Sequence, residues 1–274
     1  MKNIIPCGAF FPKSASGYLL NPCSHQLVDQ RYLPMLKEII KAYIDQEGAK
    51  LHSVYLRGSV PRGMAMGTCD LDTFALIFTE TDRWRKPEWA DGVQEVLKKE
   101  YPFVSETELI VASYGPVLRS QSKESDTTSA NTNPNLAMMI KTQSICLYGN
   151  DISPKLPMYR PDVSMMLSYL WLADDLKDFN ENKKDETKQR DVRRVILKTL
   201  IRSGFELVMS RIQQYTPDLY LCYRSFADFY PKEGEWMRQI LEAYLNVEEV
   251  EVKEVDGMVN ELGSWMIAEF KRSM

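Results

Sequence analysis

The sequence predicts an α/β domain followed by an all-helical domain, and two observations indicate this fold class. Up to about residue 155, segments rich in branched and aromatic residues alternate with segments of helical periodicity, in the order strand, helix, strand, helix, strand. From Pro161 to the C-terminus, every patterned segment has helical spacing. We therefore expect two domains, residues 1–155 and 156–274, which suits a chain of 274 residues at roughly 150 residues per domain.

In the first domain, a helix is expected to begin near Ser24 and to end at Gly48, because apolar residues recur between them at helical spacing. Residues 59–66 have room for one or two helical turns between the first two strands. The next helix is closed by Pro102. The predicted strands are "HSVYLRG", "DLDTFALIFTE" and "SETELIVAS". The helix between the second and third strands is "PEWADGVQEVLKKEYP".

Polar segments separate the remaining predicted elements. Residues 120–134 are almost free of apolar side chains and predict a mobile surface loop. The segment "NLAMMIKTQSICLYG" is then expected to be helical, with "GNDISPKLP" as the linker to the second domain. The helices predicted after Pro161 are "PDVSMMLSYLWLADDLKDF", "QRDVRRVILKTLIRSGFELVMSRI", "PDLYLCYRSFADFYP", "GEWMRQILEAYL" and "VDGMVNELGSWMIAEFKR".

Composition excludes several classes of protein. The apolar fraction of 44% predicts a globular chain, and the net charge of −4 argues against a protein that mainly coats nucleic acid. The N-terminus, broken by Pro6 and Gly8, fails as a secretory signal, and no apolar run is long enough to span a membrane. Five widely spaced cysteines without a CxxC pair indicate reduced thiols in a cytoplasmic protein. With only two histidines, any metal would be held by carboxylates, which suits Mg²⁺ or Mn²⁺.

Two aspartates, Asp70 and Asp72, interrupt an otherwise apolar strand. Residues i and i+2 of a strand point the same way, so both carboxylates project from one face. Their repulsion is costly unless a cation lies between them, and a divalent metal is the natural cation. Upstream, Gly58 and Ser59 form a turn that offers a close backbone approach and a hydroxyl to a phosphate. A carboxylate pair at a solvated strand end is the simpler alternative, but the Gly-Ser turn favours a functional site.

The stretch "RGSVPRGMAMGTCDLD" resembles the signature of the nucleotidyltransferase superfamily of the DNA polymerase beta type: Gly-Ser, a spacer of about ten residues, then Asp-x-Asp. It is most similar to bacterial antibiotic (aminoglycoside-type) and minimal nucleotidyltransferases, in which a small α/β domain with a mixed sheet precedes a helical bundle. The segment "SICLYGNDI" also resembles the Leu-Tyr-Gly segment at which such catalytic domains often end. The chain departs from the common pattern at Thr68-Cys69, where many relatives have a polar residue, often serine, before the first aspartate.

The resemblance implies roles for these residues. The Gly-Ser turn would contact the phosphates of a nucleotide, while Asp70 and Asp72 would hold metal ions. A third carboxylate would come from the next strand, where Glu106 and Glu108 share a face. Glu108, directly before the apolar run, is the predicted metal ligand or general base, and an exposed strand-end glutamate is the alternative. Two Mg²⁺ or Mn²⁺ ions about 3.5–4 Å apart would bridge the triphosphate. The family favours ATP and an active site in the cleft between the domains.

A basic stripe is independent of this motif. On the helix that contains Arg190, Arg194, Lys198 and Arg202, these residues recur every four positions and share one face. A solvated basic face is the simpler alternative. A triphosphate held by one domain would leave charge facing the other, which favours nucleotide binding by Lys198 and Arg202. Related antibiotic-modifying enzymes use a helical-domain arginine near this point, which supports Arg202. Arg62, in the Gly-Ser turn, is either a phosphate contact or a surface residue.

An acidic and aromatic patch is predicted on the first helix of the second domain. Trp171 lies there beside Asp174, Asp175 and Asp178, a combination that binds cationic sugars or amines and that also occurs on ordinary amphipathic helices. Glu206 follows Arg202 by one turn. It either pairs with that arginine or acts as a base toward an acceptor hydroxyl.

These features predict an enzyme that transfers a nucleoside monophosphate, AMP from ATP, to a hydroxyl of a small acceptor such as an aminoglycoside-like compound, a reaction of antibiotic resistance. Two alternatives remain. One is a nucleotidyltransferase that modifies tRNA or a protein, as in toxin–antitoxin systems, and the other is a non-catalytic nucleotide-binding protein on the same fold. The acidic net charge disfavours tRNA, and the intact aspartate pair disfavours the non-catalytic alternative. The sequence specifies neither the base of the nucleotide nor the oligomeric state.

Overall fold

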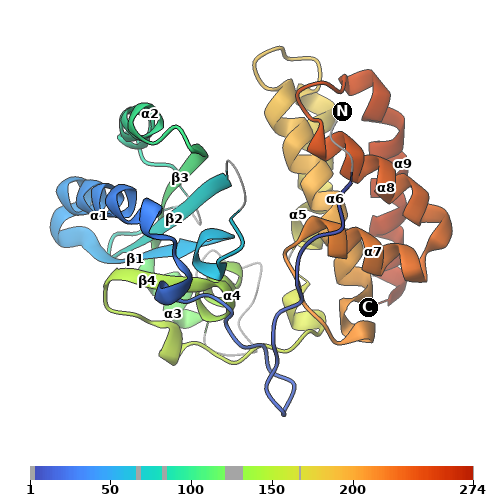
Figure 1. Ribbon diagram of the computed structural model, residues 1–274. Helices are drawn as coiled ribbons and strands as arrows, with labels where there is room; N and C mark the ends of the chain where they lie inside the picture. Colours follow the sequence, from blue (N-terminus) through green and yellow to red (C-terminus); the bar gives the residue numbers. More distant parts are fainter. Residues whose placement is uncertain (1–3, 66–68, 82–84, 121–131, 167, 274) are drawn as a thin grey trace. The chain divides into compact units, whose positions relative to one another are not determined.

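The computed structural model divides the chain into two compact units (Figure 1). The unit Ser14–Tyr159 is continuous and contains the sheet. The other unit combines Met1–Lys13 with Arg160–Met274 and is helical. The ranges that the structure describes are 4–65, 69–81, 85–120, 132–166 and 168–273. Thr68 of the motif and most of the predicted loop 120–134 therefore lie outside the described residues.

The first unit is built on a mixed four-stranded sheet in the order β3-β2-β1-β4. Strand β1 is antiparallel to both of its neighbours, whereas β2 and β3 are parallel. A parallel pair needs a crossover, and helix α2 (Ala90–Glu100) lies in the connection between β2 and β3. The predicted α/β fold with a mixed sheet is therefore confirmed. The strands are β1 (Leu51–Arg57), β2 (Cys69–Ile77), β3 (Val104–Ser113) and β4 (Ser144–Gly149).

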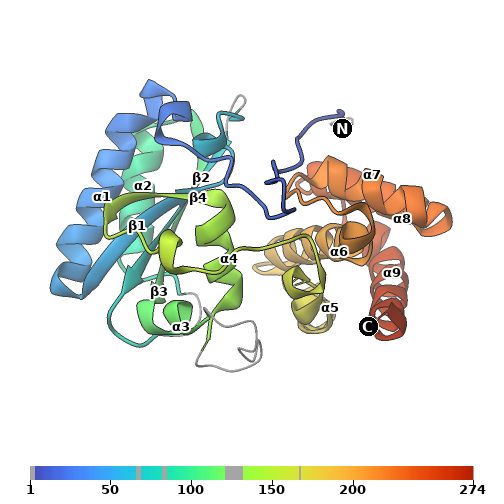
Figure 2. The same cartoon turned by 90° about the horizontal axis from the view of Figure 1, so that it is seen from below.

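Helices cover both faces of this sheet. Figure 2 shows α1 (Leu33–Glu47) and α2 on one side and α4 (Pro134–Gln143) on the other. The strands alternate accordingly, since Leu56 belongs to the core under α1 and α2 while Tyr55 packs in the core with α4 and with Val117 of the short helix α3 (Tyr114–Arg119). Because both faces are buried, the strands read as nearly continuous apolar runs, and a charged residue within them stands out.

Three predicted elements differ from the structure. The helix predicted to begin at Pro161 begins only at Tyr169, after a 3₁₀ turn over Val163–Met165. The first helix of the chain begins at Leu33, because two short 3₁₀ turns, His25–Leu27 and Gln30–Tyr32, precede it, each capped by a side chain. The segment predicted as one helix from Asn135 to Gly149 is a helix only to Gln143 and then becomes strand β4. Pairing of "SICLYG" with the free edge of β1 satisfies its backbone groups, so the contact with a strand distant in sequence decides the conformation.

The helical unit is arranged around one central helix, α6. This helix packs against all four other long helices of the unit, and residues are buried around most of its circumference. Gly204 permits this packing, since a Cβ atom there would lie 2.4 Å from the methyl carbon of Met237. The five predicted helices are present as α5 (Tyr169–Asn182), α6 (Gln189–Ile212), α7 (Leu219–Phe229), α8 (Pro231–Leu245) and α9 (Val252–Ser273).

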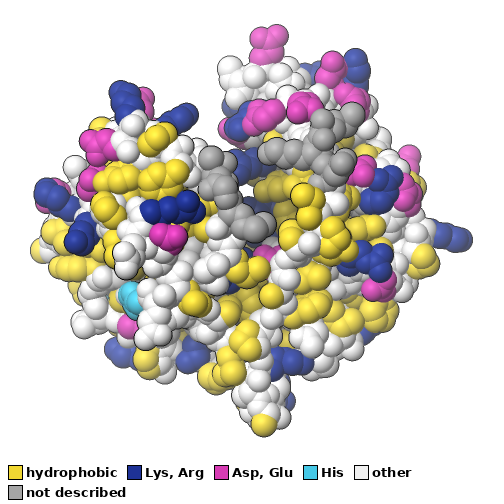
Figure 3. Space-filling model, in the orientation of Figure 1, with side chains coloured by type: hydrophobic (Ala, Val, Ile, Leu, Met, Phe, Trp, Pro, Cys, Tyr) yellow, Lys and Arg dark blue, Asp and Glu magenta, His cyan; other side chains and the backbone are white. Residues whose placement is uncertain are grey.

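Charged side chains are mixed on the visible surface of the helical unit. Figure 3 shows Lys and Arg interspersed with Asp and Glu over its helices, rather than a continuous basic face. None of the helices within the described residues is both long and apolar enough to cross a membrane.

Candidate active site

The carboxylates of the motif lie together on the α4 face of the sheet. Asp72 alternates with the core residues Leu71 and Thr73, and it is paired in register with Glu108 on the neighbouring parallel strand. Asp70 is likewise paired with Glu106. The structure thus brings the four carboxylates together as two neighbouring pairs. The outer pair, Asp70 and Glu106, is exposed. The inner pair, Asp72 and Glu108, lies closer to the core and is half-buried.

Arg57 contacts both carboxylates of the inner pair. It is the last residue of β1 and the cross-strand partner of Asp72. Its Nη2 atom donates a hydrogen bond of 2.6 Å to Oε2 of Glu108, and its Nη1 atom lies 3.8 Å from Oδ2 of Asp72. The Arg57 side chain is only 19% exposed, and its charge offsets the repulsion between these two carboxylates at short range. In the sequence, Arg57 stands out only as a charge at the end of a buried strand, and the motif itself gives it no role.

Gly58 brings the Gly-Ser turn close to Asp72. Its φ of +92° is a conformation that residues with a side chain rarely adopt. A Cβ atom at this position would lie 2.9 Å from Oδ2 of Asp72, so the aspartate rests directly over the glycine. The Gly-Ser turn therefore packs directly against the carboxylate of Asp72.

A short 3₁₀ turn over Val60–Arg62 follows the half-buried Ser59. Arg62 folds back, and its Nε donates a hydrogen bond of 3.0 Å to the carbonyl oxygen of Gly58. The backbone N–H of Met64 donates to the carbonyl oxygen of Ser59, at 3.0 Å. The Arg62 side chain thus stabilises the backbone of the turn. Its predicted contact with a phosphate stays a prediction.

The donor set at this site suits a hard divalent cation, although it is not already gathered around one point. The carboxylate oxygens of Asp70, Asp72 and Glu108 are the ligand type that Mg²⁺ and Mn²⁺ prefer. In the described part of the chain, no three His, Cys, Asp or Glu side chains are arranged to hold a metal ion. Asp70 instead accepts a hydrogen bond from the hydroxyl of Ser105, at 2.7 Å, and the inner pair contacts Arg57.

The chain was compared with protein families, curated proteins and solved structures. No protein-family model matches the sequence, and no curated protein matches it. Among solved structures, the chain is similar to spectinomycin adenyltransferase AAD(9) from Enterococcus faecialis, crystallised with ATP and spectinomycin. The TM-score is 0.46 and the sequence identity 16%, over 85% of this chain and 98% of that one.

Cys69, where the motif differs from the pattern that it resembles, has a specific environment. Its sulfur lies 3.0 Å from the hydroxyl of Tyr32, which also accepts a hydrogen bond of 2.8 Å from Nη2 of Arg31. Burial and the contact with Cys69 raise the pKa of Tyr32. The residue before Asp70 is therefore tied to the segment that precedes α1, a link that local sequence patterns do not reveal.

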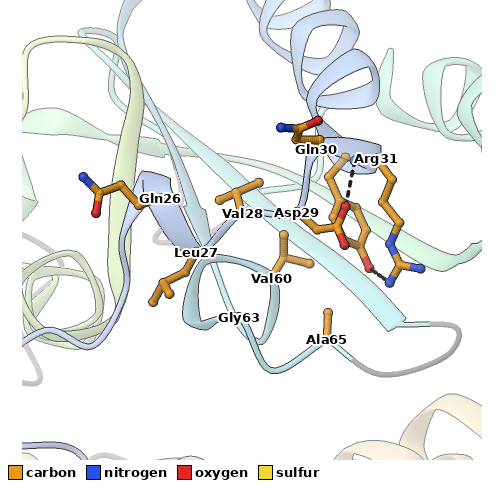
Figure 4. Close-up of a pocket in the computed structure, with 10 residues that line it drawn as sticks. Gln26, Leu27, Val28, Asp29, Gln30, Arg31, Val60, Gly63 and Ala65 are labelled. Carbon is orange, nitrogen blue, oxygen red and sulfur yellow. Dashed lines mark hydrogen bonds between the residues drawn. The ribbon is translucent and has the colours of Figure 1, made fainter.

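Polar residues line the pocket beside this segment, but the side chains of Gln26, Asp29 and Arg31 do not converge on one point. The pocket has a volume of about 470 Å³ and lies between the 3₁₀ turns of residues 26–32 and the loop that contains Gly63 and Ala65. In Figure 4, the side chains of Gln26 and Arg31 point away from each other, and Asp29 is engaged with the backbone of Arg31. The pocket therefore offers no convergent set of ligands.

The basic stripe lies on α6, and its members have different environments. Arg190 is exposed and ion-paired with Glu248, which its Nε contacts at 2.8 Å. Arg194, Lys198 and Arg202 are half-buried. Within the described residues Arg202 makes no hydrogen bond or ion pair, and its charge opposes the rise in the pKa of Cys222 that burial causes. The nucleotide-binding role of Lys198 and Arg202 stays a prediction.

The predicted acceptor patch lies on one face of α5, and its members are unequal. The side chains of Trp171 and Asp174 are exposed. Asp175 instead accepts a hydrogen bond of 2.6 Å from the hydroxyl of Thr199 on α6. Burial raises the pKa of Asp175, and the neighbouring Asp178 adds to the rise. Trp171 and Asp174 thus lie at the surface, whereas Asp175 joins two helices.

Glu206 has a structural role that the sequence did not reveal. It is 7% exposed, and its carboxylate accepts hydrogen bonds from the backbone N–H groups of Ser168 and Tyr169, at 2.8 and 3.0 Å. These are donors at the start of α5 that have no partner within that helix. Glu206 therefore caps a helix distant in sequence, a role that neither the predicted pairing with Arg202 nor the predicted role as a base anticipated.

Proposed function

We propose that this chain is a metal-dependent nucleotidyltransferase that transfers a nucleoside monophosphate, AMP from ATP, to a hydroxyl of a small acceptor. One observation carries the proposal: Asp70, Asp72 and Glu108 lie on one face of two neighbouring strands, with Asp72 in contact with the turn at Gly58. Phosphoryl transfer depends on positioning and on the neutralisation of phosphate charge, for which oxygen ligands beside a close backbone approach are suited. The resemblance of the motif supports the same reaction.

In this reaction the three carboxylates would hold Mg²⁺ or Mn²⁺, which when bound would neutralise the phosphates and make the acceptor hydroxyl a better nucleophile. The backbone of Gly58 and the hydroxyl of Ser59 would bind phosphate oxygens and orient the triphosphate. Glu108, if it is not a metal ligand, would accept the proton of the acceptor hydroxyl as that oxygen attacks the α-phosphorus, and pyrophosphate would leave. Glu106 is the alternative base.

The test is transfer of labelled AMP to a panel of hydroxylated acceptors. Asp70→Asn and Asp72→Asn should each lower turnover by about 100-fold or more, since metal stabilisation of a phosphoryl transition state is worth several kcal/mol. Asp91→Asn, an exposed aspartate of the same unit paired with Lys86, should leave turnover unchanged. Near wild-type turnover in both motif variants would overturn the assignment of the site.

The proposed acceptor is a small polyhydroxylated cation of the aminoglycoside type. The exposed Trp171 and Asp174 on α5 support this choice, because a ring beside a carboxylate attracts an organic cation. Asp174→Asn should raise the apparent KM for such an acceptor without changing nucleotide affinity, and the effect should shrink at high salt. Glu181→Gln, an equal change of charge elsewhere on α5, is the matched control. Labelling of tRNA or protein in a lysate, with small cations ignored, would favour the macromolecule-modifying alternative.

A further inference from the structure

Arg57 bridges the two half-buried carboxylates, Asp72 and Glu108, that the proposed function assigns to a metal ion. Its guanidinium contacts both Asp72 and Glu108, through Nη1 at 3.8 Å and Nη2 at 2.6 Å. The three residues lie side by side on β1, β2 and β3, according to the register of the sheet. The charge of an arginine is permanent at any physiological pH. A second cation that joins Asp72 to Glu108 must therefore either displace this guanidinium or bind against its repulsion.

A displaced guanidinium would need another anion, because a partly buried cation without a partner is costly. Arg57 immediately precedes Gly58 and Ser59, where the proposed function puts the phosphates of the nucleotide. Guanidinium binds phosphate oxygens through two parallel hydrogen bonds, a geometry that lysine cannot reproduce. The triphosphate is thus the nearest suitable partner for Arg57 once its carboxylates are taken.

We propose that Arg57 couples metal binding to triphosphate binding. Without nucleotide, Arg57 holds Asp72 and Glu108 and keeps the affinity for free metal low. With nucleotide, Arg57 exchanges the carboxylates for phosphate and the metal gains its ligands. The inference rests on the proposed function, and it explains why the described residues show the carboxylates together but not gathered around one point. Coupling of this kind is reciprocal, so the metal must strengthen nucleotide binding by the factor by which the nucleotide strengthens metal binding.

The test measures binding rather than turnover. Mn²⁺ affinity is determined by calorimetry and by electron paramagnetic resonance, with and without α,β-methylene-ATP. Arg57→Gln removes the competing cation, so it should bind Mn²⁺ alone about fivefold or more tightly than the wild type, while the gain on adding the analogue should shrink by a similar factor. Arg85→Gln, an exposed arginine of the same unit that contacts Thr81, should change neither quantity.

Arg57→Lys separates charge from geometry and guards against a variant that fails to fold. It retains the positive charge beside the carboxylates, so its affinity for Mn²⁺ alone should stay near that of the wild type. It loses the two-pronged contact with phosphate, so its affinity for the analogue in the presence of Mn²⁺ should fall.

Two results would overturn the inference. A lower or unchanged affinity of Arg57→Gln for Mn²⁺ alone would show that Arg57 merely supports the strands, while the proposed function would survive if Mn²⁺ still bound together with the analogue. Absence of Mn²⁺ binding to the wild type, even with the analogue, would remove the proposed function and the coupling together.

Discussion

Gly58 and Asp72 illustrate how the site depends on single atoms. The glycine has a positive φ, and the space that a side chain would fill is taken by a carboxylate oxygen of the proposed metal site. Arg57, the residue before it, reaches the same carboxylate from the neighbouring strand. At this scale, a change of one methyl group is enough to move a proposed ligand.

We predict that Gly58→Ala destabilises the α/β unit and also displaces Asp72. Backbone strain at a positive φ should cost about 1 kcal/mol or more of the free energy of unfolding. Gly17→Ala is the matched control, because Gly17 has a φ of +83° but nothing lies within 4 Å of the position of its Cβ. Urea unfolding and Mn²⁺ titration measure the two effects. Equal destabilisation of both variants, with Mn²⁺ affinity intact, would contradict the contact between Gly58 and Asp72.

Among the elements, β4 and the start of α5 show how distant contacts decide local structure. The segment that becomes β4 has an apolar pattern compatible with a helix, but the edge of β1 gives its backbone a partner. Helix α5 begins at Tyr169 without a cap from its own N-cap side chain, and Glu206 of α6 supplies the acceptor.

We predict that Glu206→Ala lowers the free energy of unfolding of the helical unit by about 1–3 kcal/mol, because two half-buried backbone donors lose a charged acceptor. Glu206→Gln should cost less, since its amide oxygen can still accept one bond. Chemical denaturation and hydrogen exchange at residues 168–172 measure these effects. If Glu206→Gln instead abolished turnover with stability unchanged, Glu206 would act as a base and not as a cap.

For the molecule as a whole, the two ends of the chain belong to one unit. The N-terminal segment runs along the helical unit, where the backbone N–H of Ala9 donates to Asp218 at 2.9 Å and that of Phe11 to the carbonyl oxygen of Tyr215 at 2.8 Å. Phe11 is 3% exposed and packs edge-on against Tyr215. The α/β unit is therefore a continuous segment between two parts of the helical unit.

We predict that Phe11→Ala destabilises the helical unit by about 3 kcal/mol, as expected for the loss of a buried aromatic side chain. Phe10→Ala, at a neighbour that is 37% exposed, should cost much less. Hydrogen exchange should show the loss of protection in α7 and leave β1 unchanged. A loss confined to the α/β unit would contradict the assignment of the N-terminal segment.

Local sequence patterns predicted most of the strands and helices of this protein. Branched and aromatic content predicted β1, β2 and β3, and helical spacing predicted α2 and the five C-terminal helices, although α5 begins later than expected. The alternation of a strand also predicted that Asp70 and Asp72 share a face, and the resemblance of the motif put Glu108 of the next strand forward as the third carboxylate.

Only the tertiary structure decided which distant groups meet. The hydrogen bond from Arg57 to Glu108, the cap that Glu206 provides for α5, the pairing of β4 and the docking of Phe11 join residues far apart in the sequence. Each depends on register, strand order or helix packing, which no short window of sequence contains. The sequence alone therefore determined the chemical groups of the candidate site, and the fold determined that an arginine already lies among its carboxylates, because β1 is antiparallel to β2 and ends where β2 and β3 begin.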